Sequence, residues 1–180
     1  MIKLFNPSVN CKEQDFWYQQ PVSSQYLNEA WKLFPGRWCG IDWGKKNIGI
    51  AISDRSRTIA NGINILTNTK QTKIFGELKK IIDFNEVQLI VWGLPLNMDG
   101  SLGAQAQSCR QIAKNWLQTG HQTPVLLWDE RFSSKGVERV LVQQGDLTRK
   151  RRKHLTDKLS ATWILQTVLD SSLLFDQHLK

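Results

Sequence analysis

Two short, uninterrupted apolar runs place the tightest constraint on how this chain can fold. Residues 89–92 read LIVW and end at Gly93, and residues 125–128 read VLLW and end at an Asp-Glu pair. Apolar runs of this length, bounded by turn-forming or polar residues, are typical of strands buried on both faces of a helix-covered parallel sheet. Both runs are therefore predicted to be central strands of an α/β fold.

A hairpin is predicted on the amino-terminal side of these runs. Residues 38–42 form an apolar stretch that ends in a carboxylate, and residues 48–53 alternate Ile with Gly, Ala and Ser. Alternation with a period of two indicates a strand. The glycine-containing segment 43–47 suits the turn between the two strands, and residues 58–66 are predicted to form a third strand.

Helices are predicted to connect and follow the strands. The expected helices are residues 72–84, a segment with Ala106, Cys109, Ala113 and Trp116 on one face, a helix capped by Ser133 or Ser134 that runs to Gln144, and a last helix capped by Thr156. A three-strand antiparallel meander joined by crossover helices to parallel strands makes a mixed sheet. The predicted fold class is α/β, with about five strands flanked by helices.

The chain of 180 residues has the length of one domain. Residues 1–36 are interrupted by proline, and we expect a partly ordered N-terminal extension with a short helix capped by Ser24. Aromatic side chains of this extension, such as Trp31, are expected to fold back on the rest. The single domain is predicted to span residues 37–175.

Composition indicates which kinds of partner and which cellular compartment fit this chain. The net charge of +8 and pI of about 9.6 favour a polyanionic partner, although an ordinary basic soluble protein fits them equally well. The three cysteines have no C-x-x-C spacing, which argues against a disulfide framework and a thiolate zinc site. No apolar run approaches the roughly 20 residues needed to cross a bilayer. A cytoplasmic protein without a membrane partner is expected.

Carboxylates stand where predicted elements begin or end. Asp42 closes the first strand, Asp129 and Glu130 close the last, and Asp157 opens the final helix. Because neighbouring parallel strands bring their carboxyl ends to one edge of a sheet, these acids are expected to gather there. Clustered carboxylates repel one another unless a cation neutralises them, and hard oxygen ligands suit Mg²⁺ or Mn²⁺. Such a metal site can hydrolyse a phosphodiester.

Each acid also has a purely structural explanation. Asp42 could begin a turn, Asp157 could interact with the dipole of its helix, and Asp129 or Glu130 could pair with Arg131 on the surface. Taken singly, the structural explanation is stronger for Asp42 and Asp157. Only the occurrence of all three positions together favours a metal site.

Four segments carry a family resemblance. They are residues 40–51 (GIDWGKKNIGIA), residues 91–100 (VWGLPLNMDG), residues 129–134 (DERFSS), and residues 149–153 (RKRRK) followed by TDKLSA at residues 156–161. In this order and spacing they resemble the YqgF/RuvX family over about residues 37–170. Trp43 stands where the family more often has Phe.

The resemblance implies an RNase H-like fold related to the RuvC Holliday junction resolvases. It also implies a metal-dependent endonuclease that matures the 5′ end of pre-16S ribosomal RNA. Asp42, Glu130 and Asp157 would then be the catalytic, metal-binding carboxylates, with Asp129 as the alternative second acid.

Two details bear on the choice of the second acid. Strand alternation sends Asp129 and Glu130 to opposite faces, and the longer Glu130 matches the family motif, so Glu130 is preferred. Junction resolvases carry a Glu near the end of the fourth strand, where this chain has Asn97 and Asp99.

Basic residues near these acids are expected to contact nucleic acid. They are Lys45, Arg131 and the run Arg149, Lys150, Arg151, Arg152 and Lys153, which could alternatively be a solvated loop. The expected substrate is a ribosomal RNA precursor, with a DNA junction as the alternative, and the expected assembly is a monomer or weak homodimer. A junction resolvase and a non-catalytic nucleic-acid-binding module remain open. An actin-like phosphotransferase is disfavoured because it needs two lobes.

Overall fold

The computed structural model describes the backbone of residues 24–131 and 149–176, and the side chains of residues 27–131 and 159–172. Along the chain lie α1 (Ser24–Leu33), β1 (Arg37–Trp43), β2 (Asn47–Ser53), β3 (Ala60–Thr67), α2 (Gln71–Phe84), β4 (Val87–Leu94), α3 (Ala104–Gln118), β5 (Val125–Asp129) and α5 (Arg149–Asp176). The helix expected between Ser133 or Ser134 and Gln144 lies outside the described residues.

The strands form one five-stranded sheet in the order β3-β2-β1-β4-β5. β1, β2 and β3 pair antiparallel, while β4 pairs parallel with both β1 and β5. The two apolar runs are the inner part of β4 and the start of β5, and β4 is buried along most of its length. This mixed sheet confirms the RNase H-like α/β fold that the sequence predicts.

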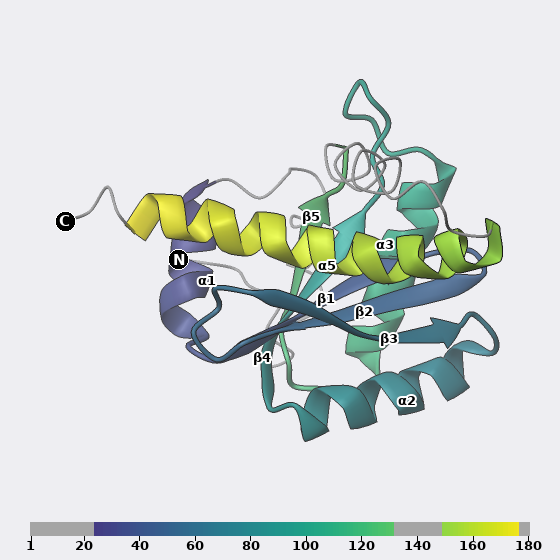
Figure 1. The fold of residues 1–180 in the computed structure, drawn as a ribbon, viewed down its shortest axis with the longest axis horizontal. Helices are drawn as coiled ribbons and strands as arrows, with labels where there is room; N and C mark the ends of the chain where they lie inside the picture. Colours follow the sequence, from purple (N-terminus) through teal and green to yellow (C-terminus); the bar gives the residue numbers. More distant parts are fainter. Residues whose placement is uncertain (1–23, 132–148, 177–180) are drawn as a thin grey trace.

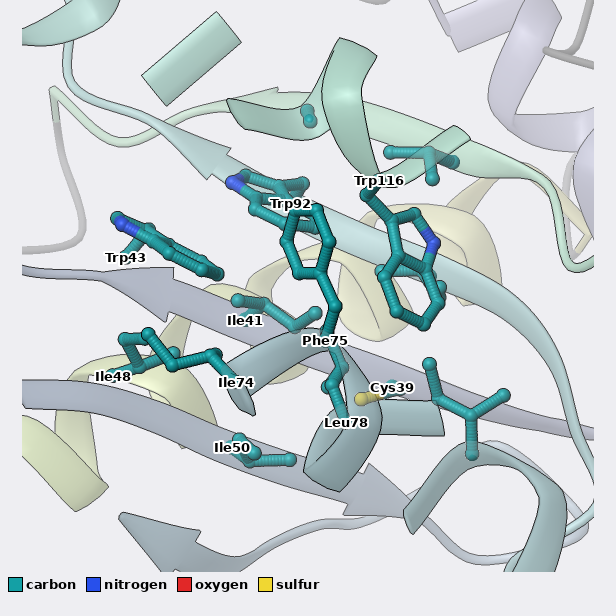
Figure 2. Close-up of a cluster of buried hydrophobic side chains, with 14 of the residues drawn as sticks. Cys39, Ile41, Trp43, Ile48, Ile50, Ile74, Phe75, Leu78, Trp92 and Trp116 are labelled. Atoms are coloured by element: carbon teal, nitrogen blue, oxygen red, sulfur yellow. The ribbon is translucent and has the colours of Figure 1, made fainter. Parts of the chain in front are cut away.

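Each face of the sheet packs against helices. The first core lies between the sheet, α2 and α3, and it contains the stacked rings of Trp43 and Trp92 with Phe75 and Trp116 (Figure 2). The second core lies on the opposite face, which α5 crosses, with α1 beside it (Figure 1). Strand alternation therefore decides which core each strand residue enters.

α1 is attached to the second core by a basic side chain. The Arg57 guanidinium lies 3.7 Å from the centre of the Trp31 ring and donates to the backbone oxygens of Trp31 and Phe34. Trp31 also meets Trp38 edge-on. Trp31 thus folds back on the sheet as predicted. The division at residues 36 and 37 between an extension and the domain stays a prediction.

The start of α5 differs from the sequence prediction. The sequence predicts that Thr156 caps this helix, which would leave residues 149–153 outside it, but α5 begins at Arg149. Arg, Lys and Leu are strong helix formers, so the basic run extends the helix by two turns and leaves Thr156 and Asp157 within it. Asp157 is therefore not a helix-start residue, and the helix dipole no longer explains it.

α5 approaches β1 most closely at a glycine. A Cβ atom at Gly40 would lie 2.8 Å from the backbone oxygen of Ala161 and 2.8 Å from the Cβ of Leu165. Both distances are shorter than van der Waals contact, so only glycine lets the helix lie this near the strand.

We expect the Gly40→Ala variant to be destabilised by about 1–3 kcal/mol, because the added methyl group forces α5 away from β1. Urea unfolding of the purified variant measures this. A free energy of unfolding equal to that of the unmodified protein would show that α5 is not packed on β1 as described.

Candidate active site

Two carboxylates lie on one face of the sheet at its carboxyl edge. Ile41 and Trp43 enter the first core, so alternation along β1 turns Asp42 to the face that α5 covers. Glu130 follows β5 directly, and its backbone N–H donates to the Leu94 oxygen at 3.2 Å. Parallel pairing of β1 with β4 and of β4 with β5 aligns the ends of the three strands.

The Glu130 carboxylate lies across a glycine in the middle strand. A Cβ atom at Gly93 would lie 1.6 Å from Glu130 Oε1 and 2.9 Å from Ile164 Cδ1 of α5. The carboxylate therefore fills the space where β4 has no side chain, beneath α5. This placement fixes its position and shields it partly from water.

Burial and neighbouring charge act together on Glu130. Burial, as the larger cause, and the negative charges of Asp42 and Asp129 together raise its pKa from 4.5 to about 8. A divalent cation would relieve both effects, because it neutralises the paired carboxylates and replaces the lost hydration. The donor set of hard oxygens fits Mg²⁺ or Mn²⁺.

These pKa shifts predict a pH dependence for the metal-free protein. A carboxyl group whose pKa is raised on folding contributes stability below its unfolded pKa, and this contribution is lost as pH rises towards the folded pKa. Between about pH 5 and pH 8 the free energy of unfolding should fall by up to roughly 1.4 kcal/mol per pH unit because of Glu130.

Urea unfolding in chelator at several pH values tests this, with Glu130→Gln as the reference because it cannot titrate. The difference between the two proteins isolates Glu130 from other titrating groups. A difference that does not change with pH would contradict the burial of this carboxyl group.

The third predicted acid lies on α5. Residue 157 precedes Ala161 by one helical turn and Ile164 by two, so helical periodicity puts it on the face that packs against β1 and β4. Its side chain is outside the described residues. Within the described side chains no group of three or more His, Cys, Asp or Glu residues could hold a metal ion. The described part of the site is thus a pair of acids.

Asp129 is engaged elsewhere. Its Oδ1 accepts the backbone N–H of Arg131 at 3.0 Å, and its Oδ2 accepts Arg131 Nε at 2.8 Å and pairs with Nη2 at 2.7 Å. The same guanidinium lies against Gly100 in the loop after β4. Asp129 and Arg131 thereby connect the end of β5 to this loop.

Asn97 and Asp99 hold the loop after β4 in shape. Asn97 Nδ2 donates to Ser101 Oγ at 2.9 Å, and the Asp99 carboxylate accepts the backbone N–H of Ser101 at 2.9 Å. Hydrogen bonds from Ser101 lower the Asp99 pKa. Lys45 is exposed in the β1–β2 turn, and the side chains of residues 149–153 are outside the described residues.

Two residues with a part in this site were missed by the sequence reasoning. The sequence indicates Gly93 only as the end of a strand and Cys109 only as a core residue of a helix. Cys109 Sγ donates to the Gly93 oxygen at 3.1 Å and accepts from Trp92 Nε1 at 3.3 Å. Burial raises the Cys109 pKa to about 12, which keeps the thiol protonated as a donor. A glycine within a buried strand was the available signal of a close approach.

The sheet order and the partly buried carboxylates at its edge define an RNase H-like α/β domain. The sequence profile of the RuvX family, described as Holliday junction resolvase, matches residues 36–171. The chain belongs to the RuvX family, which confirms the resemblance seen in the motifs.

Two relatives agree with this assignment by sequence. Proteins from Caulobacter vibrioides (strain NA1000 / CB15N) and Thermoanaerobacter pseudethanolicus, both named "Putative pre-16S rRNA nuclease", are each 43% identical to this chain. The first matches over 73% of this chain and 84% of its own length, and the second over 75% and 96%. A solved structure, T. thermophilus RuvC in complex with Holliday junction substrate, aligns with a TM-score of 0.46 at 11% identity, covering 77% of this chain and 96% of that one. Among the described residues no helix is long and apolar enough to cross a membrane.

Proposed function

We propose that this protein is a metal-dependent endonuclease that hydrolyses phosphodiester bonds during 5′-end maturation of pre-16S ribosomal RNA. The observation that carries the proposal is the partly buried Asp42–Glu130 pair at the carboxyl edge of the sheet, where the Glu130 carboxylate fills the space left by Gly93. The names of relatives at 43% identity support the RNA substrate.

The proposed metal ligands are Asp42, Glu130 and Asp157, with Mg²⁺ or Mn²⁺ as the ion. When bound, the ion supplies an activated water and stabilises the charge that develops on the phosphate oxygens. β1 holds Asp42 in place between β2 and β4, and Gly93 leaves space for the Glu130 carboxylate beneath α5. Glu130, whose pKa is about 8 in the metal-free protein, would serve as a ligand in its deprotonated form.

Basic side chains are proposed to hold the phosphate backbone beside these acids. The run 149–153 forms the start of α5, on the same helix as Asp157, and Lys45 lies in the turn after Asp42. Arg131 contributes less, because Asp129 already balances part of its charge. Phosphate contacts position a substrate without reading its sequence.

Replacing Arg151 and Arg152 with Ala should weaken RNA binding for every sequence and flatten the slope of log K against log salt by about 2. Affinity measured at several salt concentrations decides this. An unchanged slope would identify the run as solvated surface.

A cleavage assay on a pre-16S ribosomal RNA fragment and a four-way DNA junction, with Mg²⁺ or Mn²⁺ or with chelator, tests the proposed function. The expected result is cleavage of the RNA that requires Mg²⁺ or Mn²⁺ and stops in chelator. Cleavage of the junction alone would establish the resolvase alternative, which needs a dimer with two sites. Binding without cleavage of either substrate would establish a non-catalytic module. We also propose a cytoplasmic protein, which the buried free thiols of Cys39 and Cys109 fit, and a monomer or weak homodimer.

A further inference from the structure

A pocket of about 360 Å³ opens on the sheet face opposite to Glu130. Three segments line it: the β1–β2 turn, the residue after β3 and the first turns of α3. The lining residues are Trp43, Gly44, Lys45, Asn68, Ala104, Gln105, Ser108, Cys109 and Ile112. None of the residues that line it is acidic.

The pocket and the carboxylates lie on opposite faces of the sheet at the carboxyl ends of β1 and β4. Trp43 lines the pocket and follows Asp42 directly, so alternation turns the two side chains to opposite faces of β1. On β4, Cys109 in the pocket wall contacts the backbone oxygen of Gly93, and the Glu130 carboxylate lies where Gly93 has no side chain. A chain that passes over the carboxyl edge of the sheet can therefore occupy both places at once.

The lining combines the aromatic ring of Trp43, which is 9% exposed, with polar groups at the rim. The Trp43 ring is fixed, because it stacks on Trp92 with ring centres 5.3 Å apart (Figure 2). Asn68 Nδ2 donates to the Gly44 oxygen at 2.9 Å, which leaves its amide oxygen able to accept a hydrogen bond. Gln105 adds a second amide, and Lys45 adds a positive charge.

The size and charge of the pocket indicate which class of ligand it can bind. Its volume lies at the lower end of the range for small-molecule sites, roughly 300–1,000 Å³, which excludes a peptide helix or a duplex. Amide and hydroxyl groups beside an aromatic ring suit the edges and face of a nucleobase. The lining contains the cation Lys45 and no acidic residue, so its positive charge can bind a phosphate.

We propose that this pocket takes one unpaired nucleotide of the substrate strand, next to the phosphodiester held by the carboxylates. This inference rests on the proposed function and deepens it, because a base in the pocket must have left any duplex. The substrate class is then a strand that is single-stranded, or locally unpaired, at the cleavage position.

Binding of a short fluorescein-labelled single-stranded RNA to the full chain, measured by anisotropy in chelator, tests the proposal. Ser108→Trp places a large ring in the pocket, and Gln111→Trp places the same ring on an exposed part of α3 outside it. Ser108→Trp should weaken binding about tenfold, the loss typical of one base–aromatic contact, and Gln111→Trp should leave it unchanged.

A second pair of variants tests the proposal even if Ser108→Trp does not fold. Lys45 lines the pocket and its neighbour Lys46 does not, and both are exposed. Lys45→Ala should flatten the salt slope by about 0.7 for a single strand, whereas Lys46→Ala should change it less. Equal slopes for the two variants would overturn the proposal.

Three further results separate the alternatives. Equal binding by the folded tryptophan variants would overturn the pocket assignment, even if the unmodified protein cleaves RNA. Equal affinity for a duplex of the same sequence would overturn the unpaired state. Binding of adenosine or uridine monophosphate at the pocket without any effect on strand binding would identify a separate small-molecule site. Because binding is measured without metal, a failure to cleave tests only the proposed function.

Discussion

Replacement of Asp42 by Asn is expected to reduce metal-dependent cleavage by more than about a hundredfold. Mutation of residues that only hydrogen-bond to metal ligands already reduces metal affinity or activity by about 10–100-fold, and a ligand itself should matter more. The amide cannot supply the charge that the ion requires, while its size is nearly that of the carboxylate. RNA binding in chelator should stay close to that of the unmodified protein. Initial cleavage rates at saturating metal measure the effect.

Two other Asp→Asn variants serve as controls. Asp83 is exposed on α2, away from the sheet edge, and Asp83→Asn should have full activity. Asp129→Asn should lose part of its ion pair with Arg131 and retain more activity than Asp42→Asn. Full activity in folded Asp42→Asn, or equal losses at Asp42 and Asp129, would contradict the assignment.

Gly93→Ala is expected to inactivate the enzyme almost as fully as loss of Glu130 itself. The added Cβ would lie 1.6 Å from Glu130 Oε1, so the carboxylate must leave its place beneath α5. Contact with Ile164 adds overpacking, which destabilises by about 1–3 kcal/mol. Cleavage rate and urea unfolding of the same preparation measure both effects.

The matched control is Gly76→Ala. Gly76 is exposed in α2, and a Cβ there would meet nothing within 4 Å. Alanine should stabilise this helix by up to about 1 kcal/mol and leave activity unchanged. A Gly93→Ala variant as active and stable as Gly76→Ala would show that Glu130 does not lie over β4.

Most of the fold was predictable because hydrophobic patterning follows local geometry. The runs at residues 89–92 and 125–128 are buried in β4 and β5, and the alternation at residues 48–53 forms β2. The start of α5 was not predictable from its capping residue, because the helix propensity of the basic run outweighs the preference of Thr156 for a cap.

The candidate site was predictable only in part. The positions of Asp42 and Glu130 at strand ends followed from the sequence, but contact of Glu130 with the backbone of Gly93 depends on the register of β4 and β5. Similarly, the pocket beside Trp43 forms from three distant segments that only the tertiary structure brings together. Sequence spacing carries no signal for such an arrangement.

The central claim is that Asp42 and Glu130 hold a catalytic divalent ion, and anomalous diffraction from crystals soaked with Mn²⁺ tests it most directly. The anomalous peak should lie within about 2.0–2.2 Å of carboxylate oxygens of both residues. A peak on Asp129 with Glu130 unliganded would contradict the account.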